Sequence, residues 1–192
     1  MKGVTQLNLP PEIIILDVEV TTWEGTWERR WSGPGECKEV VQIGAIRVDT
    51  NTLEEKEHLS IFIKAIKNPK LSEYFINLTG ITQEVVDSEG LSPAEALKKF
   101  SNWTKGLPLY SWGKIDKNAL EETARLNNLA DFDTWSIQDI REVFKEAGIA
   151  ADQYASSTIV NAFGKTSTRL AHDGLNDART ILDGLRALRE RN

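Results

Sequence analysis

The first strong pattern in the chain is a run of four apolar residues that ends in two acids. Residues 13–16 read Ile-Ile-Ile-Leu, which is typical of a strand buried on both faces. Asp17 and Glu19 follow directly. Alternate strand residues point to the same face and each rises about 3.3 Å, so the two carboxylates would lie side by side, roughly 7 Å apart at Cα. A solvated strand end would explain them, but the adjoining apolar run favours a site where a metal cation relieves their repulsion.

Three more segments have the composition of strands. Residues 39–49 and 57–65 are β-rich, and the turn-like residues between them predict a hairpin beside the first strand. Residues 107–112 predict a short apolar strand. The stretch 68–80 lacks a regular pattern and is punctuated by Pro and Gly, so we expect it to be irregular.

Helical spacing dominates the second half of the chain. Ser92, with Pro93 in the first turn and Glu95 three residues on, forms a capping-box pattern that predicts a helix. A strand followed by a helix and another strand implies a right-handed crossover and parallel pairing. We therefore expect an α/β domain with a mixed sheet flanked by helices. Further helices are predicted at 82–87, 116–129, 136–149 and 173–189.

Composition narrows the class of protein. With 192 residues, 40% hydrophobic and 27% charged, the chain is expected to form one globular domain over 1–192, with a short tail at about 1–11. No apolar run could span a membrane or serve as a signal core, and Cys37 has no second cysteine to pair with, so a cytoplasmic location is expected. The net charge of −6 counts against a nucleic-acid binder, although bound metal and local basic patches can offset it.

Further polar candidates lie where elements meet. Asp116 stands between a short strand and a helix, and an N-cap role would also explain it. His172 precedes Asp177 by five residues, which on one helix would separate them by about 140°. We therefore expect His172 in the preceding loop, Asp173 as the helix cap and Asp177 in the second turn. An ordinary surface or packed histidine is the alternative, and His58 is interpreted as structural.

In this order, D-x-E, a later Asp and H-x4-D resemble the motifs of the DEDD-type 3′–5′ exonucleases, in the branch that carries the histidine (DEDDh). The segments QIGAI, LTGIT and SWGKIDK look like those of the branch that contains the three-prime histone messenger RNA exonuclease and KapD-like bacterial exonucleases. The resemblance extends from residue 12 to about 185. It implies an RNase H-like fold with a five-stranded mixed sheet. It also implies metal-dependent release of nucleoside 5′-monophosphates from single-stranded RNA or DNA, with RNA favoured.

The resemblance also implies roles for individual residues. Asp17, Glu19, Asp116 and Asp177 would hold two Mg²⁺ or Mn²⁺ ions. Asp17 would bridge both ions, Glu19 and Asp177 would complete the site of the ion carrying the attacking water, and Asp116 would hold the other. His172 would act as the general base.

Substrate contacts are expected from residues near these motifs. By resemblance, Gly80 would let backbone approach the terminal nucleotide and Ile81 would wedge against its base. Val20 and Thr21, after the D-x-E motif, are further candidates, although Val20 replaces the small residue or Thr that is usual there. Trp112 is also a candidate, and packing beneath the site is the simpler interpretation of it.

A loop with three tryptophans at intervals of four, Trp23, Trp27 and Trp31, has no counterpart in the resemblance. These rings could cover the core, fold as a helical turn, or form a stacking or partner surface beside the site. Four basic residues could bind phosphates, with solvated surface charge as the simpler interpretation: Lys114, Lys117, Lys165 and Arg169.

Two other functions stay open beside the exonuclease. One is a non-catalytic binding or regulatory module with the same fold, against which the crowded like charges argue. The other is a phosphoesterase that releases mononucleotides from nucleotide conjugates.

Overall fold

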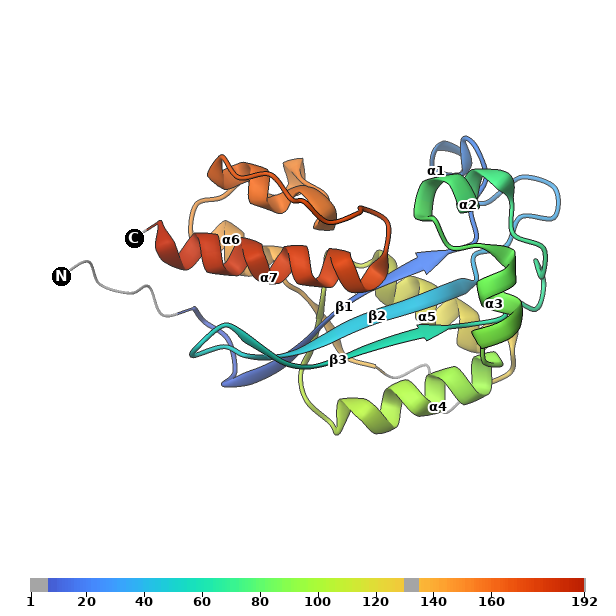
Figure 1. Cartoon of the computed structure of the whole chain (residues 1–192), viewed down its shortest axis with the longest axis horizontal. Coiled ribbons are helices and arrows are strands. Elements are labelled where there is room, and N and C mark those ends of the chain that lie inside the picture. The colour runs from blue at the N-terminus through green and yellow to red at the C-terminus, as the bar shows by residue number, and fades with distance from the viewer. Residues whose placement is uncertain (1–6, 130–134, 192) are drawn as a thin grey trace.

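The computed structural model describes residues 7–129 and 135–191, so residues 1–6 of the expected tail lie outside it. A five-stranded sheet of order β3-β2-β1-β4-β5 forms its centre, with helices on both faces (Figure 1). β1 pairs antiparallel with β2 and parallel with β4, β2 with β3 antiparallel, and β4 with β5 parallel. The expected five-stranded mixed sheet of the RNase H-like type is confirmed. The strands are β1 (Glu12–Val20), β2 (Val40–Asp49), β3 (Glu54–Phe62), β4 (Leu109–Ser111) and β5 (Ile137–Asp139).

Helical segments surround this sheet. The capping box at Ser92 is present, since its hydroxyl accepts from the Glu95 N–H at 3.3 Å and the Glu95 carboxylate accepts from the Ser92 N–H at 3.1 Å. The α-helices are α1 (Thr26–Arg29), α2 (Glu73–Thr79), α3 (Gln83–Glu89), α4 (Pro93–Thr104), α5 (Ile115–Leu126), α6 (Arg141–Glu146) and α7 (Gly174–Glu190), and the 3₁₀ segments are η2 (Ala151–Gln153) and η3 (Ser156–Phe163).

β1 is covered on both faces, as its apolar run predicts. Ile13 and Ile15 belong to a core cluster with α7 and α6, whereas Ile14 and Leu16 belong to a second cluster with α4 and α5. Figure 1 shows α7 on one side of the strands and α4 on the other. Because side chains alternate along a strand, Asp17 continues the face that α7 covers.

The expected single helix at 136–149 is wrong. Its first part is β5, where Ile137 pairs with Leu109 of β4, and α6 starts only after a turn. The Asp139 carboxylate accepts hydrogen bonds from the backbone N–H groups of Gly113 and Arg141, at 3.1 and 3.0 Å. A side chain that bonds nearby backbone in this way competes with helix formation.

Two other expectations also need correction. The stretch 68–80 is not irregular throughout, because Ser72 caps α2 by accepting from the Phe75 N–H at 3.0 Å. The second hairpin strand, expected at 57–65, begins three residues earlier. The reason is a tight turn in which Leu53, at φ 56°, donates its N–H to the Asp49 carbonyl at 2.7 Å.

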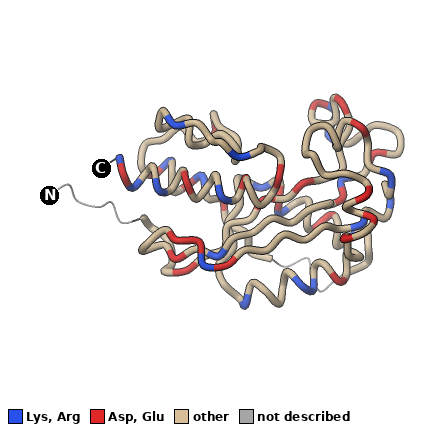
Figure 2. The backbone as a smooth tube through the Cα atoms, viewed as in Figure 1, with Lys and Arg blue, Asp and Glu red and all other residues tan. Residues whose placement is uncertain are grey.

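Charges are interspersed along the tube rather than segregated by sign (Figure 2). Within the described ranges, no helix is both long and apolar enough to cross a membrane.

Candidate active site

The five residues expected to carry the chemistry line one cavity of about 350 Å³. Asp17 and Glu19 reach it from β1, Asp116 from the first turn of α5, His172 from the loop before α7 and Asp177 from the first turns of α7. Three segments that are far apart in the sequence therefore converge on one place. The four carboxylate residues are buried, with at most 9% of their surface exposed.

The start of α7 is fixed against β2 by Gln42. Its side-chain oxygen accepts from the Gly174 N–H at 2.8 Å, and its side-chain nitrogen donates to Asp173 Oδ2 at 3.0 Å. Asp173 caps the helix by accepting from the Asn176 N–H at 2.9 Å, as expected. Since Gln42 lies opposite Glu19 in the β1–β2 ladder, the same side chain aligns α7 with the acids of β1.

His172 lies in the loop before α7, as the five-residue spacing predicts. Its backbone is left-handed, with φ 62°, and its N–H donates to Asp177 Oδ2 at 3.3 Å. This turn brings the ring beside the acids, because one ligand atom each of Glu19, His172 and Asp177 lie within 4.8 Å of one another.

Asp116 is not an N-cap, so that alternative is wrong. It lies in the first turn of α5, whose N-cap position is occupied by Lys114. Its Oδ1 instead accepts from the backbone N–H of Val18 at 3.2 Å. Val18 lies between Asp17 and Glu19, so this bond holds the third carboxylate against the strand that carries the first two.

Burial governs the protonation of these acids. It raises the pKa of Glu19 to about 9, with added repulsion from Asp177, Asp116 and Asp173. It also raises the pKa of Asp177 to about 7 and that of Asp116 to about 6. The pKa of Asp17 is raised well above its usual value by burial and then by its three acidic neighbours. Without a cation, burial therefore shifts all four carboxyl groups toward their neutral forms.

The donor set fits a hard divalent cation. Asp177 Oδ1 is buried and has no hydrogen-bond partner among the described residues. A buried acceptor left in this state costs about 1–3 kcal/mol, which a bound cation would offset. Carboxylate oxygens are the ligands that Mg²⁺ and similar ions prefer. Arg141, which also lines the cavity, is already paired with Asp139 and Asp152, at 2.6 and 3.0 Å.

The segment 154–157 completes the cavity wall and was not anticipated from the sequence. Trp112 positions it by donating its indole N–H to the Tyr154 carbonyl at 2.8 Å. Ser156 then donates to Asp177 Oδ2 at 3.5 Å. No local pattern marks these residues, because a hydrogen bond across 42 positions places them. The other lining residues that the sequence did not single out for the site are Val18, Ile115 and Arg141.

The expected substrate contacts are distributed differently. Trp112 lines the cavity, but Val20, Thr21, Gly80 and Ile81 are not among its lining residues. Ile81 is 5% exposed and packs in a small core cluster, while Gly80 ends α2 in a left-handed conformation with φ 73°. Substrate contact by these residues stays a prediction.

The three-tryptophan loop contains a helical turn, α1. Trp31 packs against the core and donates its indole N–H to the Thr21 carbonyl at 2.7 Å. Trp27 meets the Trp31 ring edge to face, with centroids 4.8 Å apart, is 46% exposed and lines the cavity. One tryptophan therefore anchors the loop, and another presents a ring beside the acids.

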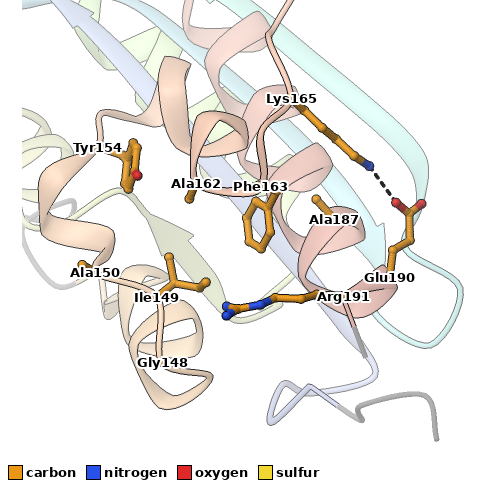
Figure 3. A pocket seen from close by; sticks show the side chains of 10 residues that line it. All are labelled: Gly148, Ile149, Ala150, Tyr154, Ala162, Phe163, Lys165, Ala187, Glu190 and Arg191. Carbon is orange, nitrogen blue, oxygen red and sulfur yellow. Dashed lines mark hydrogen bonds and ion pairs between the residues drawn. The ribbon is translucent and has the colours of Figure 1, made fainter. Parts of the chain in front are cut away.

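A larger cavity of about 570 Å³ lies between η3 and the end of α7 (Figure 3). At its rim, Lys165 pairs with Glu190 at 2.6 Å. None of the four acids or His172 lines it. The four acids and His172 thus line the smaller of these two cavities.

Comparison with known proteins agrees with this arrangement. A 3′–5′ exoribonuclease 1 from Mus musculus is 35% identical over 98 residues, which are 50% of this chain and 26% of that protein. The Homo sapiens protein of the same name is 33% identical over 93 residues, covering 48% and 25%, and the 3′–5′ exonuclease Snipper of Drosophila melanogaster is 30% identical over 93 residues, covering 48% and 31%. The chain spans only about a quarter to a third of the length of these relatives.

Two solved structures have the same fold. The nuclease domain of 3′hExo, described as a DEDDh family member bound to rAMP, has a TM-score of 0.79 at 24% identity, over 94% of this chain and 92% of that one. A 3′-exonuclease described in the 3′-end specific recognition of a histone mRNA stem-loop has a TM-score of 0.78 at 23% identity, over 94% and 82%. The model of the RNase_T exonuclease family matches residues 14–185. The chain therefore belongs to this exonuclease family, and the DEDDh resemblance is confirmed.

Proposed function

We propose that this chain is a metal-dependent 3′–5′ exonuclease that releases nucleoside 5′-monophosphates from single-stranded nucleic acid, with RNA as the favoured substrate. The observation that carries the proposal is the convergence of four buried carboxylates and His172 in one cavity. A non-catalytic domain has no evident use for like charges held together in this way. The names of the related exoribonucleases support RNA over DNA.

The carboxylates would hold two Mg²⁺ or Mn²⁺ ions, with Asp17, Glu19, Asp116 and Asp177 as the ligands. Such ions, when bound, supply a water nucleophile at neutral pH and offset charge on the scissile phosphate. Asp17 is the most central of the four, since its pKa is raised by each of the other three. The backbone bonds to Asp116 and Asp177 hold these two side chains in place before any substrate arrives.

His172 would accept the proton of the attacking water on a ring nitrogen. Partial burial lowers the pKa of His172, so the ring is neutral and able to accept a proton at pH 7. Its left-handed backbone places the ring within reach of Glu19 and Asp177, and the residue lines the cavity while staying exposed. A base that titrates near the working pH is the efficient choice for this step.

The cavity suits one nucleotide at a time. Its volume is at the lower end of the roughly 300–1,000 Å³ of small-molecule pockets. The exposed ring of Trp27 offers a face on which a base can stack, a contact that tolerates any base. We therefore expect little sequence preference.

The test uses 3′- and 5′-labelled RNA and DNA oligomers incubated with Mg²⁺, Mn²⁺ or EDTA. Mononucleotides should accumulate from the first time points, only with metal, and a circular single strand should resist. Cutting of the circle would contradict the exonuclease. Tight binding without cleavage under any metal would favour the regulatory module, and hydrolysis confined to nucleotide conjugates would favour the phosphoesterase.

A further inference from the structure

Besides the cavity that holds the acids (the first cavity) and the larger one beside η3, a cavity of about 320 Å³ lies between the loop after α1 and the outer side of α5. It is called the second cavity below. It is separate from the cavity that holds the acids, and no described residue lines both. Its wall contains two acids, two bases, an amide and an aromatic ring: Glu36, Glu122, Arg30, Lys38, Asn118 and Trp31.

Both acids of this cavity already have partners. Arg29 donates its Nε to the two carboxylate oxygens of Glu36, at 2.9 and 3.0 Å. Arg125 donates its Nε to Oε2 of Glu122 at 3.2 Å and its Nη2 to Oε1 at 2.6 Å. The negative charge on this wall is therefore compensated from within the protein.

The two bases have no such direct partner. Across residues 7–129 and 135–191, neither Arg30 nor Lys38 forms an ion pair through its side chain. Lys38 instead places its Nζ 4.3 Å from the centroid of the Trp31 ring. Burial lowers the pKa of Lys38, which indicates a cation partly removed from water, and the nearby Glu122 carboxylate offsets only part of this shift. A bound anion would restore what this cation has lost in hydration.

The position of the cavity connects it to the acids. α5 contributes Ile115 and Asp116 to the first cavity and Asn118 to the second. On the opposite wall, the touching rings of Trp27 and Trp31 each line one of the two cavities. A chain that leaves the first cavity between α5 and this ring pair would thus reach Arg30 and Lys38.

We propose that this second cavity binds the phosphodiester backbone of the substrate upstream of the scissile bond, with Arg30 and Lys38 as the phosphate-binding residues. The proposal rests on the proposed nuclease function. It assigns a role to a loop that the family resemblance does not explain. It also accounts for how an acidic chain, with net charge −6, would hold a polyanion.

The test is binding of an oligo(A) strand in Ca²⁺ across a range of salt concentrations. The variant R30Q/K38Q should bind roughly tenfold more weakly at moderate salt, and the slope of log affinity against log salt should fall by about 1.4, which is about 0.7 for each lost phosphate contact. The matched control K98Q/K99Q removes the same charge from the exposed side of α4 and should leave the slope unchanged. Arg30→Gln alone gives a second measure, because Arg30 is exposed and its side chain forms no hydrogen bond or ion pair within residues 7–129 and 135–191.

Substrate length gives an independent readout. A dinucleotide has no phosphodiester upstream of its scissile bond, so it cannot reach Arg30 and Lys38 through a phosphate. R30Q/K38Q should therefore cleave it with the wild-type kcat/KM while losing about tenfold in kcat/KM on longer strands. An unchanged slope in R30Q/K38Q and in Arg30→Gln, or an equal change in K98Q/K99Q, would overturn the proposal. If the wild type cleaved nothing, the proposed function would fail, and the binding measurements would still decide this inference.

Discussion

Gly44 of β2 and Gly174 of α7 are in direct backbone contact. A methyl group on Gly44 would lie 2.1 Å from the Gly174 carbonyl carbon and 2.0 Å from the Leu175 nitrogen. A methyl group on Gly174 would lie 2.7 Å from the carbonyl oxygen of Asp17, which faces Gly44 in the ladder. The first turn of α7 can rest on the strands only because both residues lack a side chain. This contact brings Asp177 to the acids of β1.

Gly44→Ala should therefore impair the site more than the size of the change suggests. The methyl group meets backbone that cannot rotate away, so α7 must shift. We expect a loss of about 1–3 kcal/mol in the free energy of unfolding. We also expect a loss of metal-dependent stabilisation and of nuclease activity. Denaturant unfolding, with and without Mn²⁺, measures both effects.

Gly148→Ala is the matched control for this substitution. Gly148 has φ 79° and open space around its Cα, so the added methyl group costs only backbone strain, about 1–2 kcal/mol. Activity per folded molecule and the effect of Mn²⁺ should persist. Equal behaviour of the two variants would mean that the Gly44–Gly174 contact does not position Asp177.

His172→Ala should strongly lower the rate of turnover with little effect on folding or metal binding. The four carboxylates remain, and removal of a general base typically costs about 10²–10⁴-fold in rate. Wild-type activity should also rise with pH as the imidazole loses its proton, at a pH below the ordinary value of about 6.5 because the pKa of His172 is lowered. Single-turnover rates across pH provide the measurement.

Comparing Asp177→Ala with His172→Ala distinguishes a metal ligand from a general base. Asp177→Ala should lose Mn²⁺-dependent stabilisation as well as rate, whereas His172→Ala should keep the stabilisation and bind a single strand in Ca²⁺ as the wild type does. Loss of the metal effect in both variants would make His172 a ligand instead. Cleavage near the wild-type rate by His172→Ala would remove the histidine from the mechanism.

The sequence located these residues better than it located the elements between them. Asp17 and Glu19 follow from local alternation, and the five-residue spacing placed His172 outside α7. The break between β5 and α6 depends on Asp139 bonding Gly113, 26 residues away, while the apolar spacing of 136–149 fits one helix equally well. Tyr154 reaches the site through a bond from Trp112 that no local pattern encodes. Local periodicity thus predicts what one element dictates and fails where a distant bond decides.

Metal-free protein should become less stable as pH rises from 5 to 8. Free Asp and Glu titrate near pH 4, whereas the folded pKa values of Asp116, Asp177 and Glu19 are about 6, 7 and 9. Between these limits the folded state binds more protons than the unfolded state, so the free energy of unfolding falls with rising pH. Melting temperatures in EDTA should fall by several degrees, and Mn²⁺ should offset the fall because it binds only the folded site.

Asp17→Asn is the informative variant for this behaviour. It removes a carboxyl group whose pKa is raised by burial and by three acidic neighbours, so it should raise the melting temperature in EDTA at pH 8, flatten the pH dependence and lose most of the gain from Mn²⁺. Glu89→Gln, at an exposed position of α3, should behave as the wild type. A wild-type melting temperature that does not respond to Mn²⁺ would contradict a metal site built from these acids.

Trp27→Ala should weaken substrate binding through a lost base contact. Stacking of a base on an aromatic ring contributes about 1–3 kcal/mol, so KM should rise between about fivefold and 150-fold, with a smaller change in kcat. Trp27→Phe should recover much of the loss. Trp23→Ala, in the same loop but outside the cavity lining, is the matched control and should keep the wild-type KM.

A strand whose 3′-terminal nucleotide lacks a base provides the decisive comparison. The wild type should bind it more weakly than the intact strand, whereas Trp27→Ala should bind the two almost equally. If Trp27→Ala still discriminates between the two strands as the wild type does, Trp27 does not contact the terminal base, and its exposed ring serves another purpose.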